Sequence, residues 1–181
     1  FDAEGFSNHW DEYQVAAQRQ LLPAEEASAM LHGLVESMKR AGRGKPYDCV
    51  LGLSGGVDSS YLAHLAVELS LRPLVVHFDN GWNSELAVSN IEQLVKGLKL
   101  DLHTFVMDWP EFRDLQRAYF KASVVDLEVP TEHMILGALY QIATKNRLKY
   151  ILSGTNVVTE GILPSRWYYP TFDLANLRDI H

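Results

Sequence analysis

The segment SGGVDSS at residues 54–60 combines two glycines, three hydroxyl groups and one carboxylate. Gly55 and Gly56 can adopt a positive φ angle and let the backbone approach a ligand closely. Successive N–H groups in such a turn form a concave site for an anion, and a helix that follows adds the positive end of its dipole. Further hydroxyl donors stand at Ser54, Ser59 and Ser60. These residue types predict a site for phosphate groups.

Asp58 is the informative residue of the segment, because a carboxylate beside phosphates is repulsive unless a metal ion bridges them. We therefore expect Asp58 to bind Mg²⁺, directly or through water. The alternative is an aspartate that caps the following helix. The Walker A lysine and the pattern G-x-G-x-x-G are both absent. A Walker A lysine serves γ-phosphate transfer, so its absence argues against a kinase or an ADP-forming ATPase.

Strands and helices alternate around this segment. Short apolar, β-rich stretches predict strands at residues 47–53, 72–78, 102–107 and 149–154. Apolar residues at three- and four-residue spacing predict helices at residues 23–41, 59–70, 84–99, 110–121 and 131–147. Thr131 is the candidate N-cap of the last helix. This order predicts an α/β fold, a doubly wound parallel sheet with helices on both faces.

In such sheets a ligand binds beyond the carboxyl ends of the strands. The four predicted strands end in SGGVDSS, FDNGWNS, MDWPEF and SGTN, all of them polar, so we expect one convergent site. Asp79 and Asn80 after the second strand can contact ribose or adenine, or simply form a turn in DNG. Gly154, Thr155, Asn156 and Glu160 follow the fourth strand at the same edge.

Composition limits the classes of partner. The net charge of −7 argues against nonspecific nucleic-acid binding, which requires an excess of basic residues. No run of about 18 apolar residues is present to span a membrane. The single cysteine, Cys49, lies in a predicted buried strand, which excludes a disulfide framework. The first residues show no basic stretch followed by an apolar run and a small-residue cleavage site, so we expect no secretory leader. We expect a cytoplasmic protein that binds neither membrane nor nucleic acid, and a chain that is part of a longer protein.

SGGVDSS, placed after an apolar strand and before a helix, resembles the PP-loop signature of the N-type ATP pyrophosphatases. The resemblance implies an adenine nucleotide alpha hydrolase-like fold over residues 46–181, preceded by an N-terminal helical segment, residues 1–45. Members of this superfamily split ATP between the α- and β-phosphates, adenylate a substrate oxygen and release pyrophosphate. The implied ligands of ATP and Mg²⁺ are Ser54, Gly55, Gly56, Val57, Asp58, Ser59 and Ser60, with Ser54 and Asp58 in catalytic roles. The implied adenosine site comprises His77, Phe78, Asp79 and Asn80.

Three longer blocks, VHFDNGWNSELAVSNIE, EVPTEHMI and SGTNVVTEGILP, resemble the N-acetyl sugar amidotransferases of lipopolysaccharide and pseudaminic-type sugar pathways. The resemblance implies a UDP-linked acetamido sugar as substrate. AMP transfer to the amide oxygen would give an activated imidate, and ammonia would then displace AMP to leave an acetamidine. A separate glutaminase would supply the ammonia, since a buried Cys49 offers no nucleophile. The enzyme can also be a homodimer.

Other candidate residues carry two interpretations each. Glu132 either completes a favourable charge arrangement at a helix start or, because PTEH resembles a motif of the family, acts in catalysis. Arg166 either offsets phosphate or carboxylate charge or is a solvated loop residue. The aromatic residues Trp167, Tyr168 and Tyr169 either stack on a base or pack in an interface. Ser7 and Trp10 replace cysteines typical of the family, so we expect no zinc site there, and His9 alone is an ordinary histidine.

Two other hypotheses remain open at this stage. A tRNA-modifying PP-loop enzyme, of the thiolation or lysidine type, would need a basic surface or an RNA-binding domain, and co-purified tRNA would support it. A catalytically silent ATP-binding module would bind ATP tightly without turnover, although the acid and hydroxyls of the loop argue against it.

Overall fold

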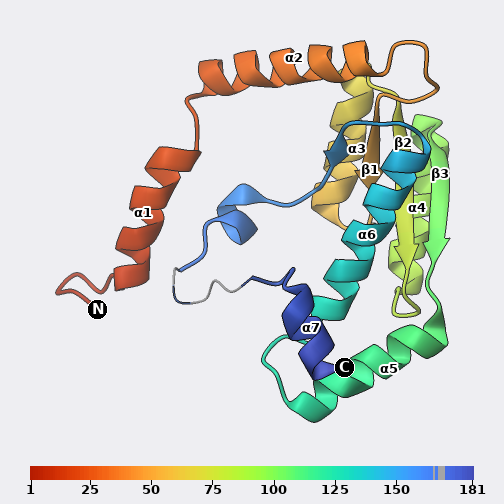
Figure 1. Ribbon diagram of the computed structural model, residues 1–181. Helices are drawn as coiled ribbons and strands as arrows, with labels where there is room; N and C mark the ends of the chain where they lie inside the picture. Colours follow the sequence, from red (N-terminus) through yellow and green to blue (C-terminus); the bar gives the residue numbers. More distant parts are fainter. Residues whose placement is uncertain (165, 167–169) are drawn as a thin grey trace. The chain divides into compact units, whose positions relative to one another are not determined.

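The computed structural model describes residues 1–164, 166 and 170–181 (Figure 1). It divides into two compact units. The N-terminal unit comprises residues 1–37 and 155–169, and the sheet unit comprises residues 38–154 and 170–181. The sheet unit contains the PP-loop, so its architecture decides how the site is built.

Four parallel strands form the sheet of the sheet unit. They are β1 (Cys49–Gly52), β2 (Pro73–Asp79), β3 (Asp101–Val106) and β4 (Ile151–Leu152), in the order β3-β2-β1-β4. Val50 of β1 pairs with Leu74 of β2 on one side and with Ile151 of β4 on the other. The predicted parallel α/β sheet is therefore confirmed.

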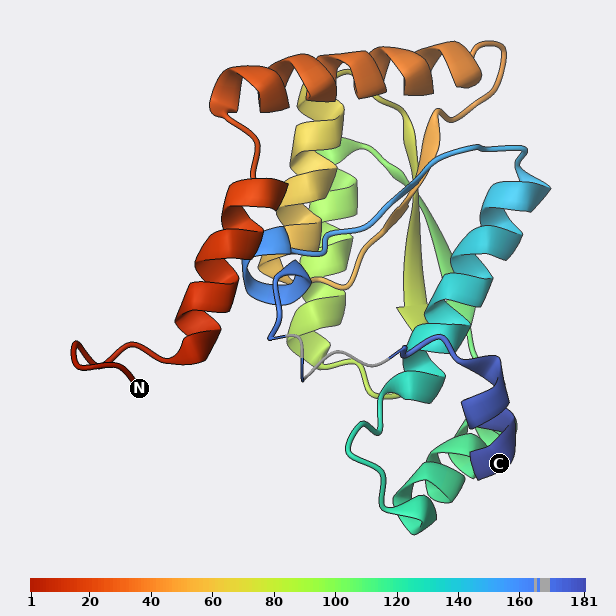
Figure 2. The same cartoon turned by 60° about the vertical axis from the view of Figure 1, so that its left-hand side comes forward.

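Helices cover both faces of this sheet. One face carries α3 (Val57–Glu68) and α4 (Glu85–Leu98), and the opposite face carries α6 (Val129–Lys145) (Figure 2). The helices α5 (Trp109–Ala122) and α7 (Leu174–Ile180) lie beyond the carboxyl ends of the strands. The chain runs outward from β1 to β3 and then returns to the far side of β1 as β4. The sheet is doubly wound, and its switch point, where ligands bind in such folds, lies between β1 and β4.

The core lies between the sheet and α6. Val50, Leu74 and Val76 pack there against Leu139 and Ile142 of α6. The residues that alternate with them on β1 and β2 are also buried, so both strands are covered on two faces. This burial on two faces explains why both strands have continuous apolar sequences. In contrast, β3 is an edge strand, and five of its six residues are exposed.

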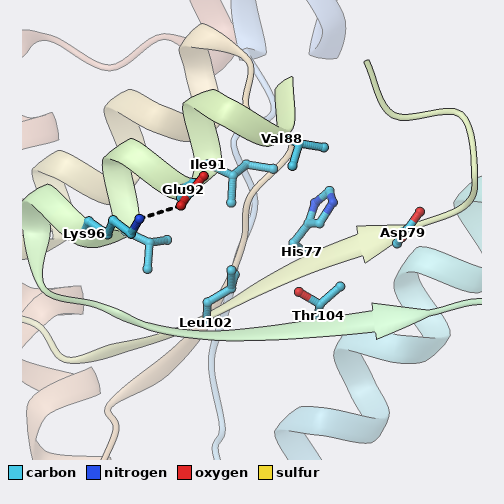
Figure 3. Close-up of a pocket in the computed structure, with 9 residues that line it drawn as sticks. His77, Asp79, Val88, Ile91, Glu92, Lys96, Leu102 and Thr104 are labelled. Carbon is cyan, nitrogen blue, oxygen red and sulfur yellow. Dashed lines mark hydrogen bonds and ion pairs between the residues drawn. The ribbon is translucent and has the colours of Figure 1, made fainter. Parts of the chain in front are cut away.

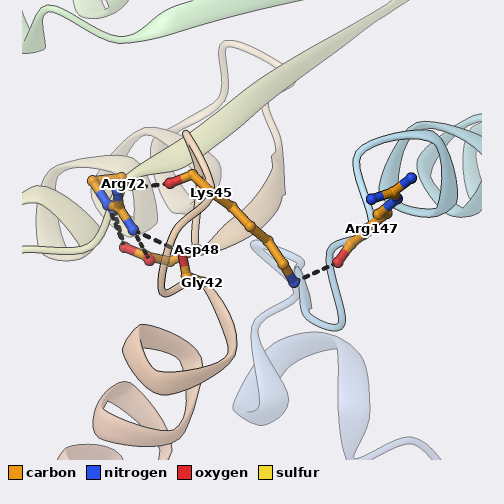
Figure 4. A network of polar contacts seen from close by, with 5 residues as sticks. All are labelled: Gly42, Lys45, Asp48, Arg72 and Arg147. Carbon is orange, nitrogen blue, oxygen red and sulfur yellow. Dashed lines mark hydrogen bonds and ion pairs between the residues drawn. The ribbon is translucent and has the colours of Figure 1, made fainter.

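A polar network ties the sheet together at its amino edge (Figure 4). The carboxylate of Asp48, only 2% exposed, accepts hydrogen bonds from the backbone N–H and the guanidinium of Arg72. The same guanidinium donates to the carbonyls of Lys45 and Gly42, and Lys45 Nζ donates to the carbonyl of Arg147 (2.7 Å). This network joins the starts of β1 and β2 at the edge opposite the PP-loop.

Helices also dominate the N-terminal unit, which holds α1 (Asn8–Gln20), most of α2 (Ala24–Ala41) and a π-helical turn (Val157–Gly161). The hydroxyl of Ser7 caps α1 by accepting the N–H of Trp10 (3.3 Å). No group of three or more His, Cys, Asp or Glu side chains that could hold a metal ion is found among the described residues. No helix in the described part of the chain is long and apolar enough to cross a membrane.

Several predicted boundaries need correction. The helix expected from residue 59 begins at Val57, because Gly56 is its N-cap. The helix expected from Thr131 begins at Val129 with Glu128 at the N-cap, so Thr131 is not a cap but a buried residue of the first turn. Pro130 fits this first turn because its missing N–H has no intrahelical partner there. The strand expected at residues 149–154 is reduced to Ile151–Leu152.

Candidate active site at the PP-loop

The PP-loop connects β1 to α3 with a backbone that only glycine adopts easily. Gly55 has φ +80° and Gly56 is extended, and α3 begins immediately after it. The Ser54 and Ser59 hydroxyls lie 3.0 Å apart, and Gly56 N–H donates to the Ser54 oxygen (3.4 Å). The Ser60 N–H donates a hydrogen bond to the carbonyl of Gly56 (3.1 Å) at the start of α3. The loop therefore gathers hydroxyl groups and backbone N–H groups at the N-terminus of a helix, as expected for an anion site.

Asp58 is exposed in the first turn of α3. It does not cap the helix, because Gly56 occupies the N-cap position and makes no side-chain cap. No side chain among the described residues pairs with the Asp58 carboxylate. One free carboxylate beside hydroxyl groups fits Mg²⁺, which proteins commonly hold through one or two carboxylates together with substrate phosphates. The neighbouring Val57 has no polar side-chain atom, so only its backbone can contribute to an anion site.

Gly154 brings the end of β4 against this loop. A Cβ atom on Gly154 would lie 2.7 Å from Ser59 Cα and 2.8 Å from Ser59 N, so no larger residue fits without a backbone shift. The carboxyl ends of β1 and β4 therefore meet at the switch point of the sheet. The sequence predicted Gly154 at this edge but gave no sign of its contact with α3.

Thr155, Asn156 and Glu160 belong to the N-terminal unit, where the last two form a local cap. The Asn156 side chain accepts the N–H of Val158 (3.1 Å), and the Glu160 carboxylate accepts the N–H of Asn156 (3.0 Å). This reciprocal arrangement stabilises the start of the π-helical turn. Binding of ATP by these residues stays a prediction.

The predicted adenosine residues lie at the end of β2. His77 is buried, and its Nδ1–H donates to the Leu53 carbonyl (3.3 Å), since a carbonyl oxygen can only accept. Phe78 stacks on Phe105 of β3, with ring centroids 5.6 Å apart. Both residues fix the ends of neighbouring strands to each other.

Asp79 and Asn80 form the turn that the sequence left open as an alternative. Asp79 accepts hydrogen bonds from the Gly81 N–H (3.0 Å) and from the Asn83 amide (3.2 Å). Asn80 accepts the N–H of Trp82 (3.0 Å). Their side chains therefore shape the loop before α4, and contact with adenosine stays a prediction for both.

A pocket of about 430 Å³ lies between α4 and the strands β2 and β3 (Figure 3). Its walls are mainly apolar, and an ion pair between Glu92 and Lys96 lies on the α4 side. The His77 ring and the Asp79 carboxylate reach its border from β2. The remaining lining residues are Val88, Ile91, Val95, Leu102 and Thr104. The predicted adenosine residues thus adjoin an apolar recess that no local sequence pattern revealed.

The other candidates are dispersed over the chain. Glu132 is half-buried in the first turn of α6, and the next residue, His133, packs edge-on against Phe172 at 5.8 Å. Helices between parallel strands run antiparallel to them, so this turn lies at the same edge of the sheet as the PP-loop. Arg166 is exposed. The aromatic residues Trp167, Tyr168 and Tyr169 lie outside the described residues.

Asn90 is a contact of the PP-loop that the sequence analysis did not single out. Its side-chain amide donates to the carbonyl of Gly55 (3.2 Å) from the second turn of α4. The only sequence signal was its position within the family-like block that begins at Val76. Asn90 therefore belongs with the loop, although it lies far from the loop along the chain.

Comparison with known proteins identifies the family. A family model described as NAD synthase matches residues 28–164, well over half of the chain. The chain belongs to the NAD synthase family. No curated protein matches it.

Solved structures of NMN and NAD synthetases share its fold. NMN synthetase from Francisella tularensis is 19% identical, with a TM-score of 0.56 over 75% of this chain and 56% of that one. NH3-dependent NAD synthetase from Campylobacter jejuni subsp. jejuni is 17% identical, with a TM-score of 0.52 over 72% and 57%. Glutamine-dependent NAD+ synthetase from Acinetobacter baumannii, in complex with ADP, is 20% identical, with a TM-score of 0.55 over 87% and 27%. The chain spans little more than half the length of the first two.

The family assignment confirms the predicted PP-loop fold and the predicted membership in the PP-loop superfamily. The NAD synthase family generally uses ATP with Mg²⁺. Binding of Mg²⁺ by Asp58 stays a prediction. The matches described above do not include an N-acetyl sugar amidotransferase. That narrower assignment therefore depends on the sequence blocks alone.

Proposed function

We propose that the protein containing this chain uses ATP to activate a carbonyl oxygen as its AMP ester, and that ammonia then displaces AMP. The supporting observation is the lysine-free loop at the switch point of the sheet, with an exposed Asp58 in the first turn of α3. Membership in the NAD synthase family supports the same AMP-forming class.

The residues of the loop have complementary tasks in this proposal. The N–H and hydroxyl groups of Ser54, Gly56 and Ser59 bind the departing pyrophosphate and hold the α-phosphorus in line with the acceptor oxygen. Asp58 holds Mg²⁺, which when bound offsets the charge of the phosphates. Glu132 and Arg166 are proposed to contact the reacting groups, and His77 with residues 78–80 to hold the adenosine.

The reaction balances in two steps. The acceptor oxygen attacks the α-phosphorus and pyrophosphate leaves. Ammonia next attacks the activated carbon, and AMP leaves with the former acceptor oxygen on its phosphate. Adenylation is needed because the carbonyl oxygen is otherwise a poor leaving group. For an amide acceptor the product is an amidine, and for a carboxylate it is an amide.

For the acceptor we propose a nucleotide-linked acetamido sugar, converted to an acetamidino sugar for lipopolysaccharide or another surface glycan. The support is the likeness of three blocks, from Val76, Glu128 and Ser153, to the sugar amidotransferases. A pyridine nucleotide with a free carboxylate is the second candidate. It is favoured by the family model and by the names of the structural relatives, which are NMN and NAD synthetases.

Ammonia is proposed to come from a separate glutaminase in the cytoplasm. Cys49 is fully buried in β1, and burial together with the charge of Asp48 raises the pKa of its thiol to about 12. It therefore stays protonated and inaccessible, unlike the nucleophile of a glutaminase. Relatives described as NH3-dependent and glutamine-dependent show that both ammonia sources occur among similar proteins.

The acceptor can be determined by an isotope experiment on the full-length protein. It is incubated with ATP, Mg²⁺, ammonium and either a UDP-diacetamido-uronate or nicotinate adenine dinucleotide, each carrying heavy oxygen in the reacting group. The proposal predicts heavy oxygen in AMP only with the sugar. Heavy AMP only with the dinucleotide would replace the sugar by the pyridine nucleotide and leave the chemistry unchanged.

A further inference from the structure

Helix α4 forms the rear support of the PP-loop. Gly55 is buried against the first turn of α4, where a Cβ atom on it would lie 2.5 Å from the Ala87 carbonyl oxygen. Its own carbonyl accepts the hydrogen bond from Asn90, one turn further along the helix. The start of α4 is itself fixed, because the Ser84 hydroxyl accepts the Ala87 N–H (3.1 Å). Two contacts from one helix thus define where Gly55 lies.

The hydrogen bond from Asn90 also determines the direction of the next N–H group. In a trans peptide, the carbonyl of Gly55 and the N–H of Gly56 point to opposite sides. While the carbonyl faces Asn90, the Gly56 N–H faces the hydroxyls of Ser54 and Ser59, where it donates to Ser54. Glycine on both sides makes rotation of this peptide plane sterically easy. A rotated plane would present a carbonyl oxygen to the anion site and repel phosphate.

We propose that Asn90 is a positioning residue, which keeps the Gly55–Gly56 peptide oriented so that its N–H group serves the phosphates of ATP. The inference rests on the proposed function, since it assigns the anion at this loop to ATP. Asn90 touches no reacting atom in this account. It acts through the carbonyl of Gly55 alone, so its effect is on the affinity and alignment of ATP.

An Asn90→Asp substitution tests this role because it retains the shape of the side chain and removes the donor when ionised. The ionised carboxylate would face the Gly55 carbonyl, so ATP·Mg²⁺ binding by the full-length protein should weaken roughly ten- to a hundredfold at pH 8. Lowering the pH to about 4, the ordinary pKa of an aspartate, protonates about half of the introduced carboxyl groups, restores a donor there and should recover part of the loss. The KM for ATP should rise while that for ammonia stays unchanged.

The matched control is Asn146→Asp, which removes an amide donor to the carbonyl of Ile142 (2.9 Å) at the end of α6. It should leave ATP binding unchanged at every pH. ATP binding by the wild-type protein is measured at the same pH values, which corrects for titration of the native groups on the surrounding elements. These groups are Asp58, His64 and Glu68 on α3, His77 and Asp79 on β2, and Glu85 and Glu92 on α4.

Two results would overturn the inference. The first is an Asn90→Asp variant that binds ATP as tightly as the wild-type protein. The second is a loss of ATP affinity that is equal at all pH values and that Asn146→Asp reproduces, because it would show a general loss of stability. The proposed function fails separately, if the wild-type protein binds ATP through this loop but releases ADP. In that case the pH-dependent loss in Asn90→Asp would still support the positioning role.

Discussion

At the residue scale, the Asp58 carboxylate has no side-chain partner among the described residues, whereas two other acids of the sheet unit are engaged. Buried Asp48 forms an ion pair with Arg72, and Asp79 accepts a hydrogen bond from the Gly81 N–H in the turn before α4. A carboxylate left exposed in the first turn of α3 is favoured by the helix dipole and can bind a cation without first breaking a native contact.

Asp58→Asn should reduce pyrophosphate release by the full-length protein by roughly a hundredfold or more, because the substituted amide binds Mg²⁺ poorly. The melting temperature should fall by no more than a few degrees, since the substitution removes only the favourable interaction of the carboxylate with the helix dipole. Asp114→Asn is the control, because Asp114 is an exposed acid on α5 that pairs with His181. Equal turnover of Asp58→Asn and Asp114→Asn would remove Asp58 from the metal site.

Cys49 should be chemically inert in the native protein. With a thiol pKa of about 12, almost no thiolate is present at pH 8, and the fully buried side chain is shielded from reagents. Labelling with iodoacetamide at pH 8 should therefore be slow and should become fast in concentrated urea. Rapid labelling without denaturant would contradict the burial of β1.

At the element scale, the contact of β4 with the first turn of α3 holds the two halves of the sheet together at the site. Gly154→Ala should destabilise the protein by about 2 kcal/mol, because its methyl group would overlap the backbone of Ser59. Gly137→Ala, an exposed glycine inside α6 with open space around it, should instead stabilise by about 0.5–1 kcal/mol. Urea unfolding measures both, and equal midpoints would contradict the close approach.

Local patterns predicted the order of strands and helices, because apolar periodicity and glycine are short-range signals. The same signals predicted the switch-point site, since all strand ends of a parallel sheet meet at one edge. They could not predict the contact of Gly154 with Ser59 or of Asn90 with Gly55, which join segments far apart in the sequence. The start of α6 was misplaced because Thr131 is a good cap by type, whereas burial selected the turn before it.

At the scale of the whole molecule, the chain contains the proposed ATP site, and the acceptor site is not assigned. The relatives of known structure extend well beyond the matched region, as the chain covers 56% and 57% of two of them. The net charge of −7 favours a small anionic substrate held by specific groups over a polyanionic tRNA. We thus expect the full-length protein to purify without bound nucleic acid.

The bond of ATP that breaks is the most direct test of the account. Phosphorus NMR of a reaction containing the full-length protein, ATP, Mg²⁺, ammonium and the acetamido sugar nucleotide separates the two possible product pairs. The account predicts AMP and pyrophosphate in equal amounts, formed only when the acceptor is present. ADP and inorganic phosphate as the products would contradict it.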